Sequence, residues 1–272
     1  MKVTTFKPRF IATGLAIGLA MISQAYAAPQ VFTVDPPLTA PFQADSMSGF
    51  SSELLHGDLG AGTLTATSGW LSFTGFSLGG VPVAAGTSRI GLDYGLYITF
   101  DLVANYSGGA AFATPGSNYN LSSLNFQMWR DDGVDTIFTA AATPGTEATV
   151  AVGAADVLLA TGSLITGVAG FNPLLGAFLN ATTTFAITAA GGAFFTAPVP
   201  FYNLAFSALN NTSQAINKDT PGGCAGLDND CTIGVNAAGI IDFNNVPEPA
   251  TLALLGMGLM GVGISLRKRK AT

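Results

Sequence analysis

Leu96-Tyr97-Ile98-Thr99-Phe100-Asp101-Leu102 is the stretch that decides the fold class. Every second residue is large and apolar, and the positions between them carry two hydroxyl groups and a carboxylate. Successive side chains of a β-strand point to opposite faces, so this alternation predicts a strand with one buried and one exposed face. An amphipathic helix would instead need apolar residues three or four positions apart.

The same alternation recurs along the chain. It is seen at 71–74, 124–128, 202–206 and 241–243. Clusters of Gly, Pro, Asp and Ser separate these segments and are typical of turns. Many short strands joined by turns predict an all-β fold, an antiparallel β-sandwich-like single domain over residues 28–244. The less regular stretch 151–181 is predicted to be mostly strands, with a loop around 170–173.

Residues 1–27 have the three parts of a secretory signal peptide. A positively charged start is followed by an apolar segment at 10–22, which is too short to make a good membrane span. Ala25 and Ala27 are the small residues of a cleavage site, which places the start of the mature chain near Ala28. The chain is therefore expected to be exported.

The end of the chain, 245–272, also has three parts. Pro247, Glu248 and Pro249 form a short motif in which the proline rings keep the backbone extended. Residues 250–266 carry no charge, and as a helix they would be about 25 Å long, near the lower limit for a bilayer core of about 30 Å. Four consecutive cations follow, which the positive-inside rule keeps on the cytoplasmic side. These are Arg267, Lys268, Arg269 and Lys270.

This order of motif, apolar helix and basic tail resembles the PEP-CTERM sorting signal of Gram-negative bacteria. The resemblance covers 246–270 and implies that exosortase, a transpeptidase-like membrane enzyme, recognises Pro247, Glu248 and Pro249. It also implies that the protein is anchored in the inner membrane transiently and then reaches the cell surface or the extracellular matrix. An ordinary C-terminal anchor that is never processed is the alternative.

The charge balance of the exported span limits its partners. Between residues 28 and 246 there are 15 acidic residues but only three cations, Arg89, Arg130 and Lys218, a formal charge of −12. A nucleic-acid-binding face needs clustered cations, so nucleic acid is excluded as a partner. Anionic polysaccharide or lipid would also be repelled unless a divalent cation bridges the two surfaces.

Cys224 and Cys231 are the only two cysteines, and they flank a short acidic loop. In an oxidising compartment an even pair this close is expected to form a local disulfide. Closing so short a loop would remove about 2–3 kcal/mol of unfolded-state freedom. The spacing, with the only histidine far away in the sequence, is a poor match to a zinc site.

Two acidic stretches offer oxygen ligands for calcium. Asp131, Asp132 and Asp135 lie in a glycine-containing turn after a predicted strand, and Asp228 and Asp230 lie between the two cysteines. Ca²⁺ takes about six to eight oxygen ligands from such loops. Neither stretch has EF-hand spacing, and Asp is also a common turn residue. The sequence therefore predicts no required cofactor and leaves calcium as the one inorganic ligand to consider.

The sequence predicts no enzyme active site. His56 is the only histidine, and a Ser-His-Asp triad would also need a serine held in a nucleophile turn or an equivalent. The two glutamates of the exported span, Glu53 and Glu147, and its 13 aspartates include no pair that the sequence marks as a glycosidase acid and base. Trp129 lies on the polar face of its predicted strand, where it can be either a carbohydrate platform or half-buried packing.

Four short segments of the exported span resemble the flocculation-associated group of PEP-CTERM proteins. They are 32–35, 93–97, 129–136 and 194–202. The resemblance implies a non-enzymatic surface protein that helps cells aggregate in flocs or biofilm, through contacts with extracellular polysaccharide or with other copies of itself. The alternatives are a lectin-like carbohydrate-binding module that uses calcium, and a polysaccharide-active enzyme.

Overall fold

The computed structural model describes residues 29–142, 145–173, 176–210, 217–218 and 230–244. The predicted signal peptide and the C-terminal segment 245–272 lie outside these residues, as do Cys224 and Asp228. The predicted disulfide therefore stays a prediction. Its other member, Cys231, is buried.

Among the described helices, none has both the length and the apolar character needed to cross a bilayer.

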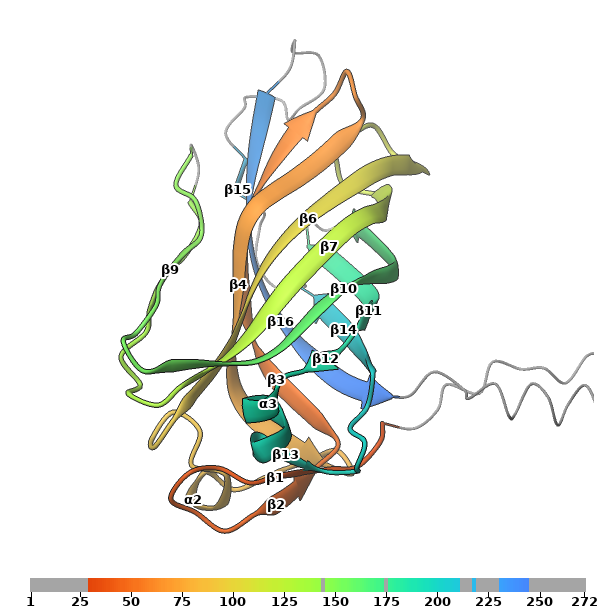
Figure 1. Cartoon of the computed structure of the whole chain (residues 1–272). Helices are drawn as coiled ribbons and strands as arrows, with labels where there is room; N and C mark the ends of the chain where they lie inside the picture. Colours follow the sequence, from red (N-terminus) through yellow and green to blue (C-terminus); the bar gives the residue numbers. More distant parts are fainter. Residues whose placement is uncertain (1–28, 143–144, 174–175, 211–216, 219–229, 245–272) are drawn as a thin grey trace, which may run out of the picture.

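One large antiparallel sheet forms most of the structure (Figure 1). Eight of its strands follow one another in a ring, because β10 pairs with both β7 and β11. In ring order they are β3 (Ser46–Asp58), β4 (Thr63–Leu78), β6 (Gly95–Gly109), β7 (Ser117–Asp131), β10 (Asp156–Phe171), β11 (Ala177–Thr184), β14 (Leu204–Asn210) and β16 (Asp230–Asn244). β16 pairs with β3 and completes the ring.

The all-β antiparallel prediction is confirmed, but the predicted sandwich of two sheets is wrong. The reason is physical: both architectures bury one face of every strand, so both produce the same alternating pattern. The decisive contact is the pairing of β10 with β11, from Leu164↔Thr183 to Phe171↔Ala177. It joins the two ends of the sheet and leaves no free edge among the eight strands.

β7 shows how the alternation builds the wall. Its inward side chains are buried, namely Tyr119, Leu121, Leu124, Phe126 and Met128, and its outward side chains are exposed, namely Asn118, Asn120, Ser122, Asn125 and Gln127. The buried positions are odd-numbered up to Leu121 and even-numbered from Leu124, and the register with β6 shifts at this point. The bulge lets a 15-residue strand keep its apolar face inward although the sequence alternation is interrupted.

A three-stranded sheet lies at one end of the ring. It consists of β1 (Phe32–Val34), β2 (Phe42–Ala44) and β13 (Phe195–Ala197). Its aromatic side chains pack edge-to-face onto the core of the large sheet, with the rings of Phe32 and Phe243 5.1 Å apart. Two segments that are distant in sequence, 32–35 and 194–202, thus meet in one aromatic cluster.

The remaining elements are short. They are β5 (Val81–Pro82), α2 (Ala85–Ser88), β8 (Ile137–Thr139), β9 (Thr149–Ala151), β12 (Ala186–Ile187), α3 (Ala189–Phe194) and β15 (Asn217–Lys218). β12 pairs with β10, whereas β8 and β9 pair with each other in a separate two-stranded sheet.

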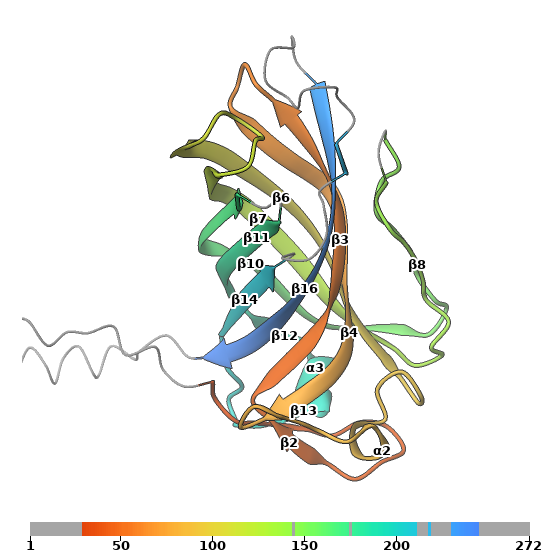
Figure 2. The same cartoon turned by 180° about the vertical axis from the view of Figure 1, so that it is seen from behind.

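The β8–β9 hairpin and its flanking residues form an arm, defined here as 132–142 and 145–155. Figure 2 shows it beside β3 and β4, on the outside of the large sheet. Trp70 Nε1 donates to the Thr139 carbonyl at 2.8 Å, and the Ala141 amide donates to Ser52 Oγ at 2.8 Å. Leu54 on the outer face of β3 is buried against Ala141. The arm therefore covers apolar surface that the sheet alone would expose.

Candidate functional site

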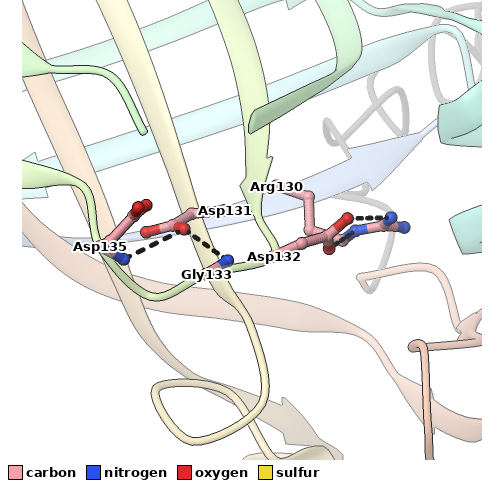
Figure 3. Close-up of polar contacts among 5 residues, drawn as sticks. All are labelled: Arg130, Asp131, Asp132, Gly133 and Asp135. Atoms are coloured by element: carbon pink, nitrogen blue, oxygen red, sulfur yellow. Dashed lines mark hydrogen bonds and ion pairs between the residues drawn. The ribbon is translucent and has the colours of Figure 1, made fainter. Parts of the chain in front are cut away.

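The first candidate site lies where β7 ends and the arm begins. The Asp131 carboxylate accepts hydrogen bonds from three backbone amides of the following turn, as Figure 3 shows for the first two. The donors are Gly133 at 3.0 Å, Asp135 at 3.3 Å and Thr136 at 2.9 Å. One side chain thus holds the turn in place.

Asp131 is 3% exposed. Burial by itself raises the pKa of a carboxyl group, because it penalises the charged form. Here hydrogen bonds from Thr136, Asp135 and Gly133 outweigh the effect of burial, and the pKa of Asp131 lies below its usual value. The side chain is therefore a carboxylate at neutral pH.

Asp156 opens β10 directly opposite Asp131, so the two acids stand at the two ends of the arm. Carboxylate oxygens of Asp131, Asp135 and Asp156 all lie within 4.8 Å of one another. Tyr97 Oη donates to Asp156 Oδ2 at 2.6 Å, and Thr136 Oγ1 donates to the same oxygen at 3.0 Å. The other oxygen, Asp156 Oδ1, is buried and has no hydrogen-bond partner among the residues that the structure describes.

Two observations indicate that these three acids could bind a hard divalent cation. The first is Asp156 Oδ1, a buried acceptor that a cation would satisfy. The second is Gly153, where an added Cβ would collide with Asp135 Oδ1, so a side chain there would displace one of the three carboxylates. Asp131, Asp135 and Asp156 are the residues that could hold calcium, through their carboxylate oxygens.

The predicted calcium ligands are thus partly revised. Asp131 and Asp135 come together, whereas Asp132 forms an ion pair with Arg130 and is not part of the cluster (Figure 3). Asp132 as a calcium ligand therefore stays a prediction. The second predicted ligand group cannot be judged, since Asp228 lies outside the described residues and of Asp230 only the backbone, at the start of β16, is described.

Sequence reasoning missed Asp156. It is 25 residues after Asp131, and only the pairing of β10 with β7 brings the two together. No spacing rule would find such a pair. The available signal was weak, namely an isolated acid at the start of the apolar run Val157-Leu158-Leu159.

Aromatic rings adjoin the acidic cluster on the outer face of the sheet. Trp129 is half-buried and stacks on Tyr97, with ring centroids 6.5 Å apart and an interplanar angle of 14°. Phe138 of the arm packs against both Tyr97 and Trp70. Of the two alternatives for Trp129, the structure supports packing.

A second unusual acid lies inside the ring of strands. Glu53 of β3 is 6% exposed, and within the described part of the chain its Oε2 has no hydrogen-bond partner. Burial raises the pKa of Glu53 to about 8, although the Ser51 side chain acts in the opposite direction. The sequence held a signal for this position, because Glu53 is two residues from Leu55 and must share its face in a strand.

His56 of β3 contacts the arm. Its Nε2 lies 2.6 Å from Glu147 Oε1, and the two side chains are 43% and 35% exposed. The residues are 91 positions apart in the sequence. This partly exposed polar contact joins the arm to β3, in addition to the buried contacts that hold the arm against the sheet.

Comparison with known proteins identifies one segment. Residues 245–270 match the PEP-CTERM protein-sorting motif, which confirms the sorting signal predicted from Pro247, Glu248, Pro249 and the basic tail. No curated protein and no solved structure matches the chain. The motif marks the protein as one that is exported, processed by exosortase and sorted to the surface of a Gram-negative bacterium.

Proposed function

We propose that this protein is a non-enzymatic component of the cell surface or extracellular matrix that promotes cell aggregation within exopolysaccharide. The observation that carries the proposal is the sorting motif at 245–270, because it directs the described domain to the surface. A protein delivered there meets two abundant partners, the cells' own polysaccharide and neighbouring copies of the same protein.

The character of the outer surface supports this role. Between Asn118 and Gln127 the outward side chains of β7 are amides and hydroxyls rather than charged groups. Asn and Gln amides both donate and accept hydrogen bonds, as sugar hydroxyls do. The few cations and the formal charge of −12 favour a neutral polysaccharide over an anionic one.

The test uses the native host with the gene deleted. Cells that carry the wild-type protein are expected to flocculate and sediment faster than deletion cells. Replacing the motif with alanine, as Pro247→Ala, Glu248→Ala and Pro249→Ala together, is expected to keep the protein in the inner membrane and abolish the gain in sedimentation. The neighbouring Asn245→Ala is the matched control and should behave as wild type.

Sedimentation and mass spectrometry of the C-terminus together decide the outcome. Wild-type protein in the surface fraction is expected to end near Pro249, without residues 250–272. Normal sorting with no change in sedimentation upon deletion would refute the aggregation role while leaving the sorting signal intact.

The acidic cluster supports a second candidate, a carbohydrate-binding module that uses calcium. Three carboxylates within 4.8 Å, one with a buried unpartnered oxygen, are the specific observation in its favour. Calcium bound there would link the start of the arm at Asp131 to its end at Asp156 and would hold the arm against the sheet.

Isothermal titration of the full exported chain with CaCl₂ tests this candidate. Wild-type protein is expected to bind one Ca²⁺, and Asp135→Asn or Asp156→Asn is expected to weaken binding at least tenfold. Asp132→Asn is the matched control, because it removes an acid from the same turn that pairs with Arg130 instead. Equal effects of Asp132→Asn and Asp135→Asn would contradict the site.

A further inference from the structure

A groove of about 700 Å³ runs between the arm and the outer face of four neighbouring strands, β4, β6, β7 and β10. Val150 and Val152 of the arm line one side, and Val152 is 56% exposed. Thr99, Gln127 and Thr161 line the floor from three adjacent strands. The groove thus has an apolar side and a polar floor.

The polar floor is an ordered row. Gln127 lies directly opposite Thr99 of β6 on one side and Thr161 of β10 on the other. Adjacent strands are about 4.8 Å apart, so the row is about 10 Å long. Within the described part of the chain these three side chains make no hydrogen bond to protein, which leaves their donors and acceptors available to a ligand.

The charge of the groove restricts the ligand. Asp101 is the only charged residue among those described that line it, and Asp101 Oδ2 accepts a hydrogen bond from Asn125 Nδ2 at 3.0 Å. No cation lines the groove among the described residues, so an anionic chain would meet repulsion without compensation. A cationic ligand would find one carboxylate, already paired with an amide.

The chemistry of the lining matches a sugar ring. Hydroxyl and amide groups both donate and accept, as sugar hydroxyls do, and the C–H face of a sugar is apolar like the valine side. Clefts that bind small molecules commonly combine apolar walls with a few placed polar groups. We propose that this groove binds a segment of a neutral polysaccharide, with Thr99, Gln127 and Thr161 contacting its hydroxyls and Val150 and Val152 contacting its apolar face.

This assignment deepens the proposed surface function by naming the site and class of its polysaccharide partner, and it is tested separately on purified protein. The full exported chain is applied to immobilised neutral hexose oligosaccharides and to uronic-acid oligosaccharides of the same length. Retention on the neutral set alone is expected. The best neutral oligosaccharide is then titrated into the protein by calorimetry.

Gln127→Ala combined with Thr161→Val is expected to weaken that binding at least tenfold, because two hydrogen-bonding groups of the row are lost. Asn120→Ala is the matched control, since Asn120 is also exposed on the outer face of β7 but does not line the groove. Near-ultraviolet circular dichroism checks that each variant keeps the wild-type fold.

Three results would overturn the assignment. They are no retention on neutral oligosaccharides, preference for the uronic-acid set, and equal affinity of the double variant and the Asn120→Ala control. A groove that fails these tests in a protein that still increases sedimentation would refute the site but not the aggregation role. The reverse result, binding without any effect on sedimentation, would refute the aggregation role but not the site.

Discussion

Glu53 and Asp131 are both buried carboxyl groups, yet the structure treats them in opposite ways. Glu53 faces the interior of the ring of strands, where one of its oxygens has no partner in the described ranges, and burial raises its pKa to about 8. Asp131 lies outside the ring, at the base of the arm, and backbone amides bring its pKa below the usual value despite burial. The Glu53 carboxyl is largely neutral at pH 7, whereas the Asp131 carboxyl is charged.

Burial alone therefore does not decide the charge of an acid. The deciding factor is whether backbone donors replace the lost water. A turn can present several free N–H groups to one carboxylate, as residues 133–136 do for Asp131. The backbone donors of a strand are already used in sheet pairing, so Glu53 finds none in β3 or its neighbours.

The largest expected effect comes from the raised pKa of Glu53. Between its ordinary pKa of 4.5 and a pKa of about 8, the folded state holds a proton that the unfolded state has released. The free energy of unfolding should therefore fall as pH rises through this range, by about 1.4 kcal/mol per pH unit. Glu53→Gln removes this dependence, and we expect it to be about 4 kcal/mol more stable than wild type at pH 8.

Urea unfolding of both proteins from pH 4 to pH 9 measures this difference. Near pH 4 the two proteins should have similar stability, because the carboxyl is then protonated in both states. A stability difference that stays constant between pH 5 and pH 8 would show that Glu53 ionises normally in the folded protein.

The next largest effect comes from the hydrogen bonds that Asp131 accepts. Asp131→Ala leaves three backbone amides without their acceptor, and we expect a loss of about 2 kcal/mol in the free energy of unfolding at pH 7. Because the folded pKa is lowered, the contribution of Asp131 is present above pH 3.8 and is lost as pH falls through the folded value. The wild type and the variant should therefore converge in acid.

Asp132→Ala is the matched control, since Asp132 pairs with Arg130 near the surface and should cost less than about 1 kcal/mol. Hydrogen exchange should show faster exchange of amides in 132–136 in Asp131→Ala only. Similar losses in the two variants would mean that general charge, rather than the three hydrogen bonds, explains the effect.

The smallest effect concerns a partly exposed acid of the arm, Glu147. Glu147 is part exposed, and its partner His56 has a side chain that is 43% exposed. Exposed ion pairs contribute about 0–1 kcal/mol, so His56→Ala should change the free energy of unfolding by less than about 1 kcal/mol. Urea unfolding at pH 6 is the measurement, and a loss above 2 kcal/mol would indicate that this contact, rather than the buried ones, holds the arm.

Part of this protein could be predicted from local pattern. The strands around 96–102 and 124–128 are confirmed within β6 and β7, since alternation is a property of neighbouring residues. The sorting motif is confirmed for the same reason, because its three parts are contiguous in the chain. The strands are longer than the alternating segments, because bulges such as the one in β7 restore the inward phase after an interruption.

The acidic site was predictable only in part. Asp131 and Asp135 are close in sequence, and their turn was visible as Asp-Asp-Gly-Val-Asp. Whether Asp132 or Asp135 joins the cluster depends on the direction of each side chain. Asp135 points to Asp131 and Asp156, whereas Asp132 forms an ion pair with Arg130.

The class of secondary structure, the sorting segment and the shortage of cations follow from the sequence alone, because each depends on composition or on residues a few positions apart. Only the tertiary structure decided that the sheet closes on itself, that Asp156 joins Asp131 and that the arm forms a groove with the outer wall. These features depend on contacts between strands far apart in the chain, such as β10 with β11. Such pairings are selected by the packing of the whole core, so no short segment encodes them.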